Sequence, residues 1–310
     1  MLGGRLNGGG LLVVGDVVTD VLVLHDARPD GVTDAPADIE VRPGGSGANT
    51  AAWAASLGTE VRMLARVGID SGAWHRAHLA RSGVRPCLRL DHERPTATIV
   101  VMVDPTGERT MLTDRGAGGF IGPGDWDDGL LDDVAHVHVS GYTLFTDSGA
   151  ELVRLAMARA RRHGVTISVD PASTGFLARF GVRRFLDATA EADVLLPNRD
   201  EALLLAGTPD PAAAAAYLGG RYGLAVVKLG ADGAILARDG DEPLPVPAAR
   251  SQVVDSTGAG DAFAAGFLAA RLGGASDRDA VAAGCRTGGR AVSRIGGRPA
   301  PGGPAGAPRH

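Results

Sequence analysis

Strands alternate with helices through the second half of this 310-residue chain, and that rhythm constrains the fold more than any other feature. Buried strands are expected at AHVHVS, VTISVD, ADVLLPN and LAVVKLG, and helices at 150–163, 199–207, 212–222, 261–272 and 277–294. Strands separated by helices form βαβ units, whose parallel sheet is covered on both faces. We therefore expect an α/β fold with a mostly parallel central sheet.

The first half of the chain departs from this alternation. β-branched runs at 11–14 and 17–24 predict strands, and two more strand-like runs flank Asp104-Pro-Thr-Gly, which is typical of a hairpin. These extended segments do not follow the regular alternation of strand and helix. We therefore expect a small β-sheet lid, built from about residues 17–42 and 96–115, beside the main α/β layer.

Composition narrows the classes of partner. A net charge of −5 offers no basic surface for a polyanion, so no nucleic acid is expected, and no apolar run reaches the ~20 residues that span a bilayer, so no membrane is expected. Only Cys87 and Cys285 are present, far apart in sequence, which favours a reducing cytoplasm over a disulfide framework. The Gly-rich residues 1–10 predict a flexible leader, and the Gly- and Pro-rich residues 301–310 predict a disordered tail.

The segment DSTGAGD, Asp255 to Asp261, leads into a predicted helix and is the strongest candidate for chemistry. Gly258, Ala259 and Gly260 would leave backbone N–H groups free at the first turn, where an anion is favoured. Asp261 in that cradle could accept a proton from a hydroxyl that attacks a phosphoryl group. On these residues alone, an Asp that only caps the helix is the alternative.

A second Gly-rich segment, GGSGAN from Gly44 to Asn49, also opens a predicted helix, at 49–57. Its glycines let a ligand approach the backbone, and Asn49 offers both a donor and an acceptor. A tight strand-to-helix turn with an Asn cap is the alternative. The segment fails the dinucleotide fingerprint because Thr50 stands where Gly or Ala belongs.

Taken together, the two segments resemble the signatures of the ribokinase (PfkB) family of carbohydrate kinases, GG-x-G-A-N and D-T-x-G-A-G-D, with Ser256 replacing Thr in the second. Other family landmarks follow in order: GDVVTD at 15–20, NRDE at 198–201 and KLGADG at 228–233. The resemblance spans about residues 11–300. It implies a ribokinase-like three-layer α/β/α kinase domain over those residues, with a small β-sheet lid.

The resemblance also implies roles for particular residues. Asp261 would be the catalytic base and Gly258, Ala259 and Gly260 the anion hole for the migrating phosphoryl group. The acceptor's hydroxyls would be bound by Asp20, Gly45 and Asn49.

ATP, Mg²⁺ and a monovalent cation such as K⁺ are implied in the same way. ATP would contact Asn198, Lys228, Gly230, Asp232, Gly233 and Gly260, and Glu201 would hold Mg²⁺ through water. The monovalent cation would lie near Asp255, Thr257, Ala291, Arg294 and Gly296.

Departures from ribokinase itself bear on the acceptor. Ser46 stands where ribokinase has Lys, and Ser140-Gly141-Tyr142 where it carries an acid on the mid-chain strand. Arg109, in the expected lid hairpin, could reach an anionic or polyol acceptor or be a solvated strand residue.

The function indicated is ATP-dependent phosphorylation of a hydroxymethyl group of a sugar or sugar derivative. A nucleoside kinase of the same family, or a catalytically silent sugar- or nucleotide-binding regulator, is the alternative. The resemblance also implies a homodimer formed through the lid.

Overall fold

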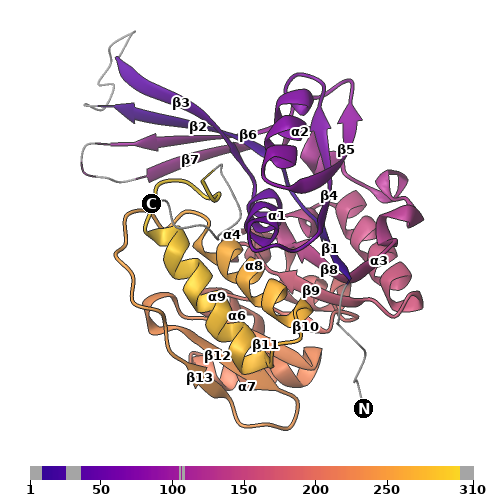
Figure 1. Ribbon diagram of the computed structural model, residues 1–310, viewed down its shortest axis with the longest axis vertical. Coiled ribbons are helices and arrows are strands. Elements are labelled where there is room, and N and C mark those ends of the chain that lie inside the picture. Colours follow the sequence, from indigo (N-terminus) through magenta and orange to yellow (C-terminus); the bar gives the residue numbers. More distant parts are fainter. Residues whose placement is uncertain (1–8, 26–35, 105, 107–108, 301–310) are drawn as a thin grey trace, which may run out of the picture.

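A nine-stranded sheet forms the centre of the computed structural model, which describes residues 9–25, 36–104, 106 and 109–300 (Figure 1). In spatial order the strands are β13 (Leu244–Val246), β12 (Ala234–Arg238), β11 (Leu224–Lys228), β10 (Val194–Leu195), β9 (Thr166–Asp170), β8 (Val134–Ser140), β1 (Gly10–Val14), β4 (Val61–Gly68) and β5 (Val84–Asp91). All pair in parallel except β12 and β13, which run antiparallel at one edge. The expected mostly parallel α/β sheet is confirmed.

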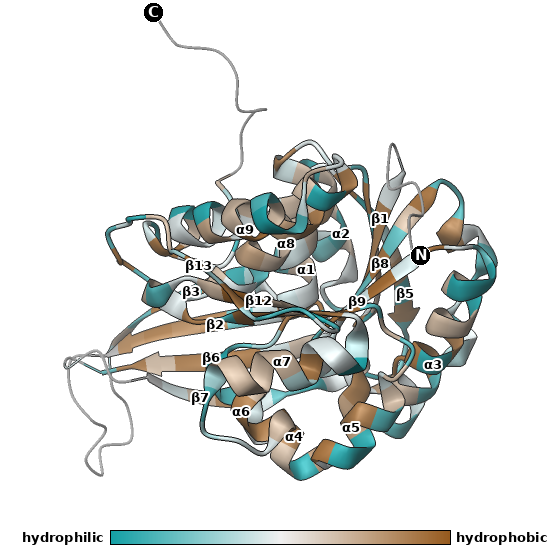
Figure 2. Ribbon diagram, turned by 90° about the horizontal axis from the view of Figure 1, so that it is seen from below, coloured by the Kyte–Doolittle hydropathy of each residue, from teal (hydrophilic) through white to brown (hydrophobic). Residues whose placement is uncertain are grey.

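Helices cover both faces of this sheet (Figure 2). One layer holds α1 (Ser46–Ser56), α2 (Gly72–Arg81), α8 (Ala259–Leu272) and α9 (Asp277–Val292). The other holds α3 (Asp147–Arg162), α4 (Thr174–Phe180), α5 (Val182–Ala188), α6 (Arg199–Ala206) and α7 (Pro211–Tyr222). In α3, for example, Leu152, Val153 and Met157 are buried at helical spacing, and full burial of such side chains is worth about 1.5–3 kcal/mol each. Among the described residues, no helix is long and apolar enough to cross a membrane.

A separate four-stranded sheet forms the lid, which projects from the main body in Figure 1. Its order is β3 (Ala37–Gly44), β2 (Val18–His25), β6 (Ala97–Val103) and β7 (Arg109–Asp114), and its central pair, β2 and β6, is parallel. β3 overlaps the end of the predicted lid segment 17–42, at residues where no strand was predicted. The lid therefore combines two stretches of chain that lie on either side of β4 and β5.

The ends of the chain bear on the predicted leader and tail. β1 begins at Gly10, the last residue of the predicted leader, and Gly10 N–H donates to the carbonyl of Asp133 over 2.6 Å. Residues 1–8 of the predicted leader and the predicted tail, residues 301–310, lie outside the described residues.

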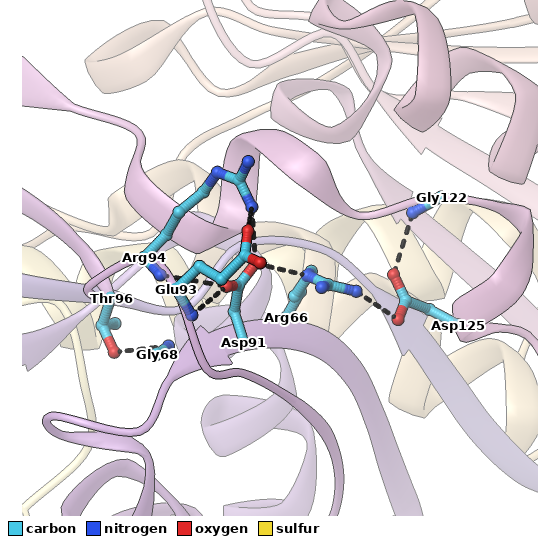
Figure 3. Close-up of polar contacts among 8 residues, drawn as sticks. All are labelled: Arg66, Gly68, Asp91, Glu93, Arg94, Thr96, Gly122 and Asp125. Carbon is cyan, nitrogen blue, oxygen red and sulfur yellow. Dashed lines mark hydrogen bonds and ion pairs between the residues drawn. The ribbon is translucent and has the colours of Figure 1, made fainter.

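A polar network fixes the root of the lid where β5 leads into β6 (Figure 3). Arg66 on β4 donates to Asp91 over 3.0 Å and to Asp125 over 2.9 Å. Asp91 also accepts from the N–H groups of Glu93 and Arg94, so the turn into the lid closes on a carboxylate that is almost completely buried. The backbone donors and Arg66 hold the pKa of Asp91 down at about 2 despite that burial.

Candidate active site

The carboxyl ends of the parallel strands open into a cavity of about 1110 Å³ that the lid overhangs. Ligands of open α/β sheets bind at this edge. Predicted site residues that line it are Asp20, Gly45, Asn49, Asn198, Glu201, Lys228, Gly230, Asp255, Thr257, Gly258, Gly260, Asp261 and Gly296. Those that do not line it are Ala259, Asp232, Gly233, Ala291 and Arg294. Arg109 begins β7, but its side chain lies outside the described part of the chain.

Asp261, in the first turn of α8, is held from the facing helix α1. Asn49 Nδ2 donates to Asp261 Oδ2 over 2.9 Å, and Ser46 Oγ donates to Oδ1 over 2.7 Å. The two Gly-rich segments therefore meet, although more than 200 residues separate them. Each carboxylate oxygen keeps a lone pair for another donor, such as a substrate hydroxyl.

The charge state of Asp261 suits proton transfer. Burial raises the pKa of Asp261 to about 7, although the donors from Asn49 and Ser46 lower it. The negative charges of Asp170 and Asp16 raise it further. A general base works best when its pKa lies near the operating pH, so a carboxylate of this pKa can take a proton and release it again.

The predicted anion hole is a left-handed turn that only glycine fits well. Gly258 has φ of +72°, and an added Cβ would approach Cα of Gly297 to 2.6 Å. Ala259 N–H already donates to the carbonyl of Ser256 over 3.2 Å. The N–H groups of Gly260 and Asp261 belong to the first turn of α8, where no preceding turn supplies carbonyls.

Lys228, at the end of β11, is the only lysine in a chain that has thirty arginines. Its Nζ donates to Asp170 over 2.5 Å, and a Cβ added to Gly260 would lie 3.4 Å from it. Burial alone would lower the pKa of Lys228, but the carboxylates of Asp170 and Glu201 outweigh burial and raise it. A permanent positive charge therefore lies beside the start of α8.

Asn198 and Glu201 form a capping box at the start of α6. Asn198 Oδ1 accepts from Glu201 N–H over 2.9 Å, while the Glu201 carboxylate accepts from the backbone and side-chain nitrogens of Asn198. Burial and the charge of Asp170 raise the pKa of Glu201. Because both Glu201 oxygens are engaged, this carboxylate suits contact with Mg²⁺ through water rather than direct ligation.

No cluster of three or more acidic, histidine or cysteine side chains suited to a metal occurs within the described ranges. A Mg²⁺ ion that keeps several waters and binds mainly through nucleotide phosphates needs no such cluster. The donor set at Glu201 and Asp170 fits that mode of binding.

At the acceptor end, Asp20 on β2 faces the cavity. Burial raises the pKa of Asp20 to about 6, against the nearby positive charge of Arg298. A Cβ added to Gly44 would come within 2.0 Å of Asp20 Oδ2, so glycine there makes room for the carboxylate. Gly45 has φ of +100° and is the N-cap residue that precedes α1. This end thus presents Asp20, Asn49 and Asp261, which can bind hydroxyl groups.

The residues expected at a monovalent cation divide into two sets. Asp255 Oδ2 accepts from Gly296 N–H over 3.0 Å, and Asp255 Oδ1 accepts from Thr257 Oγ1 over 2.7 Å, so these three are together. The second set, Ala291 and Arg294, does not line the cavity. The carbonyl of Ala291 accepts from Arg294 N–H over 3.2 Å, and the Arg294 side chain is exposed.

Several residues of the cavity were not singled out by sequence reasoning. Asp16 Oδ1 and Oδ2 accept from the N–H groups of Gly47 and Ser46 and so fix the start of α1. Asp170 lies in the segment DPAS, whose place at the carboxyl end of a strand predicts a ligand site, but the sequence assigned Asp170 no role of its own. Arg298 had no such signal, because it lies in a Gly- and Pro-rich stretch without periodicity.

The proteins that this chain resembles are kinases, in agreement with the geometry of the cavity. The family model described as pfkB family carbohydrate kinase matches residues 10–301, and the chain belongs to this family. An ATP-dependent ribose-1-phosphate kinase of Halopiger xanaduensis is 33% identical over 270 residues, 84% of each protein. A fructokinase of Klebsiella pneumoniae is 33% identical over 266 residues, covering 80% of this chain and 83% of the relative.

Solved structures agree. The adenosine kinase of Sinorhizobium meliloti superposes with a TM-score of 0.84 at 28% identity, covering 94% of this chain and 96% of the other. The expected family and the ribokinase-like fold are confirmed, and the chain is a kinase of the sugar and nucleoside class.

Proposed function

We propose that the protein transfers the γ-phosphoryl group of ATP to a hydroxymethyl group of a sugar or sugar derivative, with Asp261 as the general base. The observation that carries this proposal is the pair of hydrogen bonds that aim the Asp261 carboxylate at the cavity, beside the first turn of α8. The acceptor hydroxyl gives its proton to Asp261 as its oxygen attacks phosphorus, and ADP leaves.

ATP occupies the half of the cavity formed by Lys228, Gly230 and the start of α6. Mg²⁺, when bound, neutralises phosphate charge, and Glu201 and Asp170 orient the waters around it. Developing negative charge on the transferred group meets the N–H groups of Gly260 and Asp261 and the ammonium of Lys228. K⁺ near Asp255 and Thr257 supports the turn that carries those N–H groups.

A nucleoside acceptor is the second candidate. The lid surface that faces the cavity presents aliphatic side chains, Leu22, Ile99 and Val101 among them. A heteroaromatic base would bury these side chains better than a hexose, whose hydroxyls would lose partners there.

We also propose a homodimer that forms through the lid and a cytoplasmic location. The lid surface that faces away from the cavity carries a row of apolar residues across all four strands, Val41, Val21, Val100 and Leu112, matched by register. Val41 and Leu112 are 54% and 57% exposed, which supports a second copy of the lid as their cover. Cys87 and Cys285 are both free thiols, in keeping with a reducing compartment.

The test measures ADP release by the purified chain with Mg²⁺-ATP and, one at a time, ribose, ribose 1-phosphate, fructose, 2-keto-3-deoxygluconate and adenosine. Acceptor-dependent ADP release, with the phosphorylated acceptor identified by mass spectrometry, supports the proposal. ADP release from none of these acceptors, alongside normal ATP binding, would favour a silent binding protein.

A further inference from the structure

After α9 the chain turns back across the active site. Figure 1 shows this segment in yellow, between α9 and the root of the lid. The carbonyl of Gly297 accepts from Trp53 Nε1 over 2.9 Å, and Gly296 N–H donates to Asp255. A Cβ added to Gly297 would come within 2.6 Å of Asn49 Nδ2, so the backbone here lies directly against α1. This packing brings Arg298 to the acceptor end of the cavity.

The guanidinium of Arg298 makes two contacts with the Gly-rich segment. Nη2 donates to the carbonyl of Gly44 over 2.8 Å, and Nε donates to Asn49 Oδ1 over 3.3 Å. Burial lowers the pKa of Arg298 to about 10, with the charges of nearby carboxylates opposing, so the group stays a cation at neutral pH. Nη1 is buried with no hydrogen-bond partner among the residues described, which is unusual for a group kept only for stability.

Asn49 lies between two charged groups of opposite sign. Its amide oxygen faces the Arg298 guanidinium, and its amide nitrogen faces the Asp261 carboxylate. A flipped amide would set NH₂ against the cation and oxygen against the carboxylate, which makes two repulsive contacts. Arg298 therefore selects the orientation in which Asn49 can donate to Asp261.

We propose that Arg298 is a positioning residue for phosphoryl transfer: it locks the Asn49 amide, which in turn holds the Asp261 carboxylate toward the acceptor hydroxyl. This inference rests on the proposed role of Asp261. Through Arg298, the segment after α9 would thus contribute to the rate of phosphoryl transfer.

The kinetic test is a double-mutant cycle between Arg298→Ala and Asn49→Ala, with the best acceptor of the panel above. Arg298→Ala should lower kcat about tenfold to a hundredfold, the range of one charged hydrogen bond, while KM for ATP stays near wild type. Because Arg298 acts through Asn49, the double variant should lose no more than Asn49→Ala alone. Millimolar guanidinium should restore part of the kcat of Arg298→Ala, whereas urea should not.

The matched control is Arg290→Gln, which removes an exposed arginine of α9 a few residues upstream. Its kcat should equal that of the wild type. Arg298→Lys keeps the charge but cannot reach Gly44 and Asn49 with one planar fork, so it should lie between wild type and Arg298→Ala.

A spectroscopic test needs no acceptor. The chain has only three asparagines, Asn7, Asn49 and Asn198, so ¹⁵N-asparagine labelling gives three side-chain NH₂ pairs, and Asn49→Ala assigns one of them. The Asn49 pair should move in Arg298→Ala and keep its place in Arg290→Gln. A pair that does not move, or additive losses in the cycle, would overturn the proposal.

Asp261→Asn separates this inference from the proposed function. If Asp261→Asn keeps its activity, the general-base proposal fails. If Asp261→Asn is inactive while Arg298→Ala matches wild type in kcat and melting temperature, only the role of Arg298 fails.

Discussion

Lys228 Nζ lies 2.5 Å from Asp170 Oδ2, and these largely buried side chains stand at the carboxyl ends of β11 and β9, the strands on either side of β10. The pair joins the sole lysine of the chain to a carboxylate that sequence reasoning left without a role. An ammonium is a compact point charge, whereas a guanidinium is a wide planar fork. The chain thus has its single lysine beside Gly260, where we expect the migrating phosphoryl group.

Replacing Lys228 with Met should lower kcat about 10²–10³-fold, since a cation at the developing charge contributes in that range. KM for the acceptor should change little, because Lys228 does not lie at the acceptor end. Steady-state kinetics with both substrates varied measure this. A variant that keeps more than a tenth of wild-type kcat would contradict this role for Lys228.

Asp261→Asn should keep the fold and ATP affinity but lose at least about 10²-fold in kcat, because the amide cannot accept the hydroxyl proton. In the wild type, kcat/KM should rise with pH through about 7, since only the ionised carboxylate is a base and its pKa is raised to about 7. Below that pH the rate should fall about tenfold per unit. A variant with more than a tenth of wild-type kcat would make Asp261 merely a helix cap.

Turnover should be higher in K⁺ than in tetramethylammonium at equal ionic strength. Asp255 accepts from the N–H groups of Thr257 and Gly296 close to the turn at Gly258, and a cation bound to oxygen atoms there would polarise the N–H groups of that turn. Initial rates in the two chloride salts decide the matter. Equal rates would remove the monovalent cation from the mechanism.

Ribose should be a poor acceptor, with kcat/KM at least about tenfold below the best member of the panel. Ser46 Oγ is already engaged with Asp261, so it does not replace the cation that ribokinase carries at that position. Gly141 cannot carry an acid either, because a Cβ there would approach the carbonyl oxygens of Asp170 and Pro171 to 2.6 Å. Each missing hydrogen bond costs about 0.5–1.5 kcal/mol. A panel led by ribose would contradict this argument and leave the kinase assignment intact.

The protein should elute as a dimer, at twice the 31.5 kDa of one chain, with the lids in contact. Val41→Lys combined with Leu112→Lys should give a monomer, because two charges would then stand in the apolar row of the outer lid surface. Light scattering after size-exclusion chromatography measures the mass. Arg85→Ala, an exposed change on β5, is the control that should leave the mass unchanged.

The sequence predicted what is encoded by local patterns. The parallel sheet followed from apolar strands between amphipathic helices, and α6, α7 and α9 begin within one residue of their expected starts. α1 begins at Ser46, three residues earlier than expected, because Asp16, thirty positions away, supplies the acceptors that its first turn needs. A capping partner that distant leaves no local mark.

β3, as a strand, and Arg298, as a site residue, escaped prediction for a related reason. β3 is largely exposed and carries little apolar alternation, so only its pairing with β2 makes it a strand. Arg298 reaches the site because Gly297 packs against Trp53 and Asn49, contacts that join parts of the chain some 250 residues apart. Long-range contacts of this kind have no periodicity for a single sequence to display.

The parallel pairing of β2 with β6 bears on the order in which the parts of this chain can fold. All of α1, β4, α2 and β5 intervene between the two strands, and Arg66 ties the turn after β5 to the main sheet before β6 begins. Closing so long a loop costs entropy that the lid alone does not recover, so β2 and β6 can pair stably only after the adjoining edge of the main sheet exists. We therefore expect the lid to form late in folding, as one cooperative unit with the main sheet, and not to fold on its own.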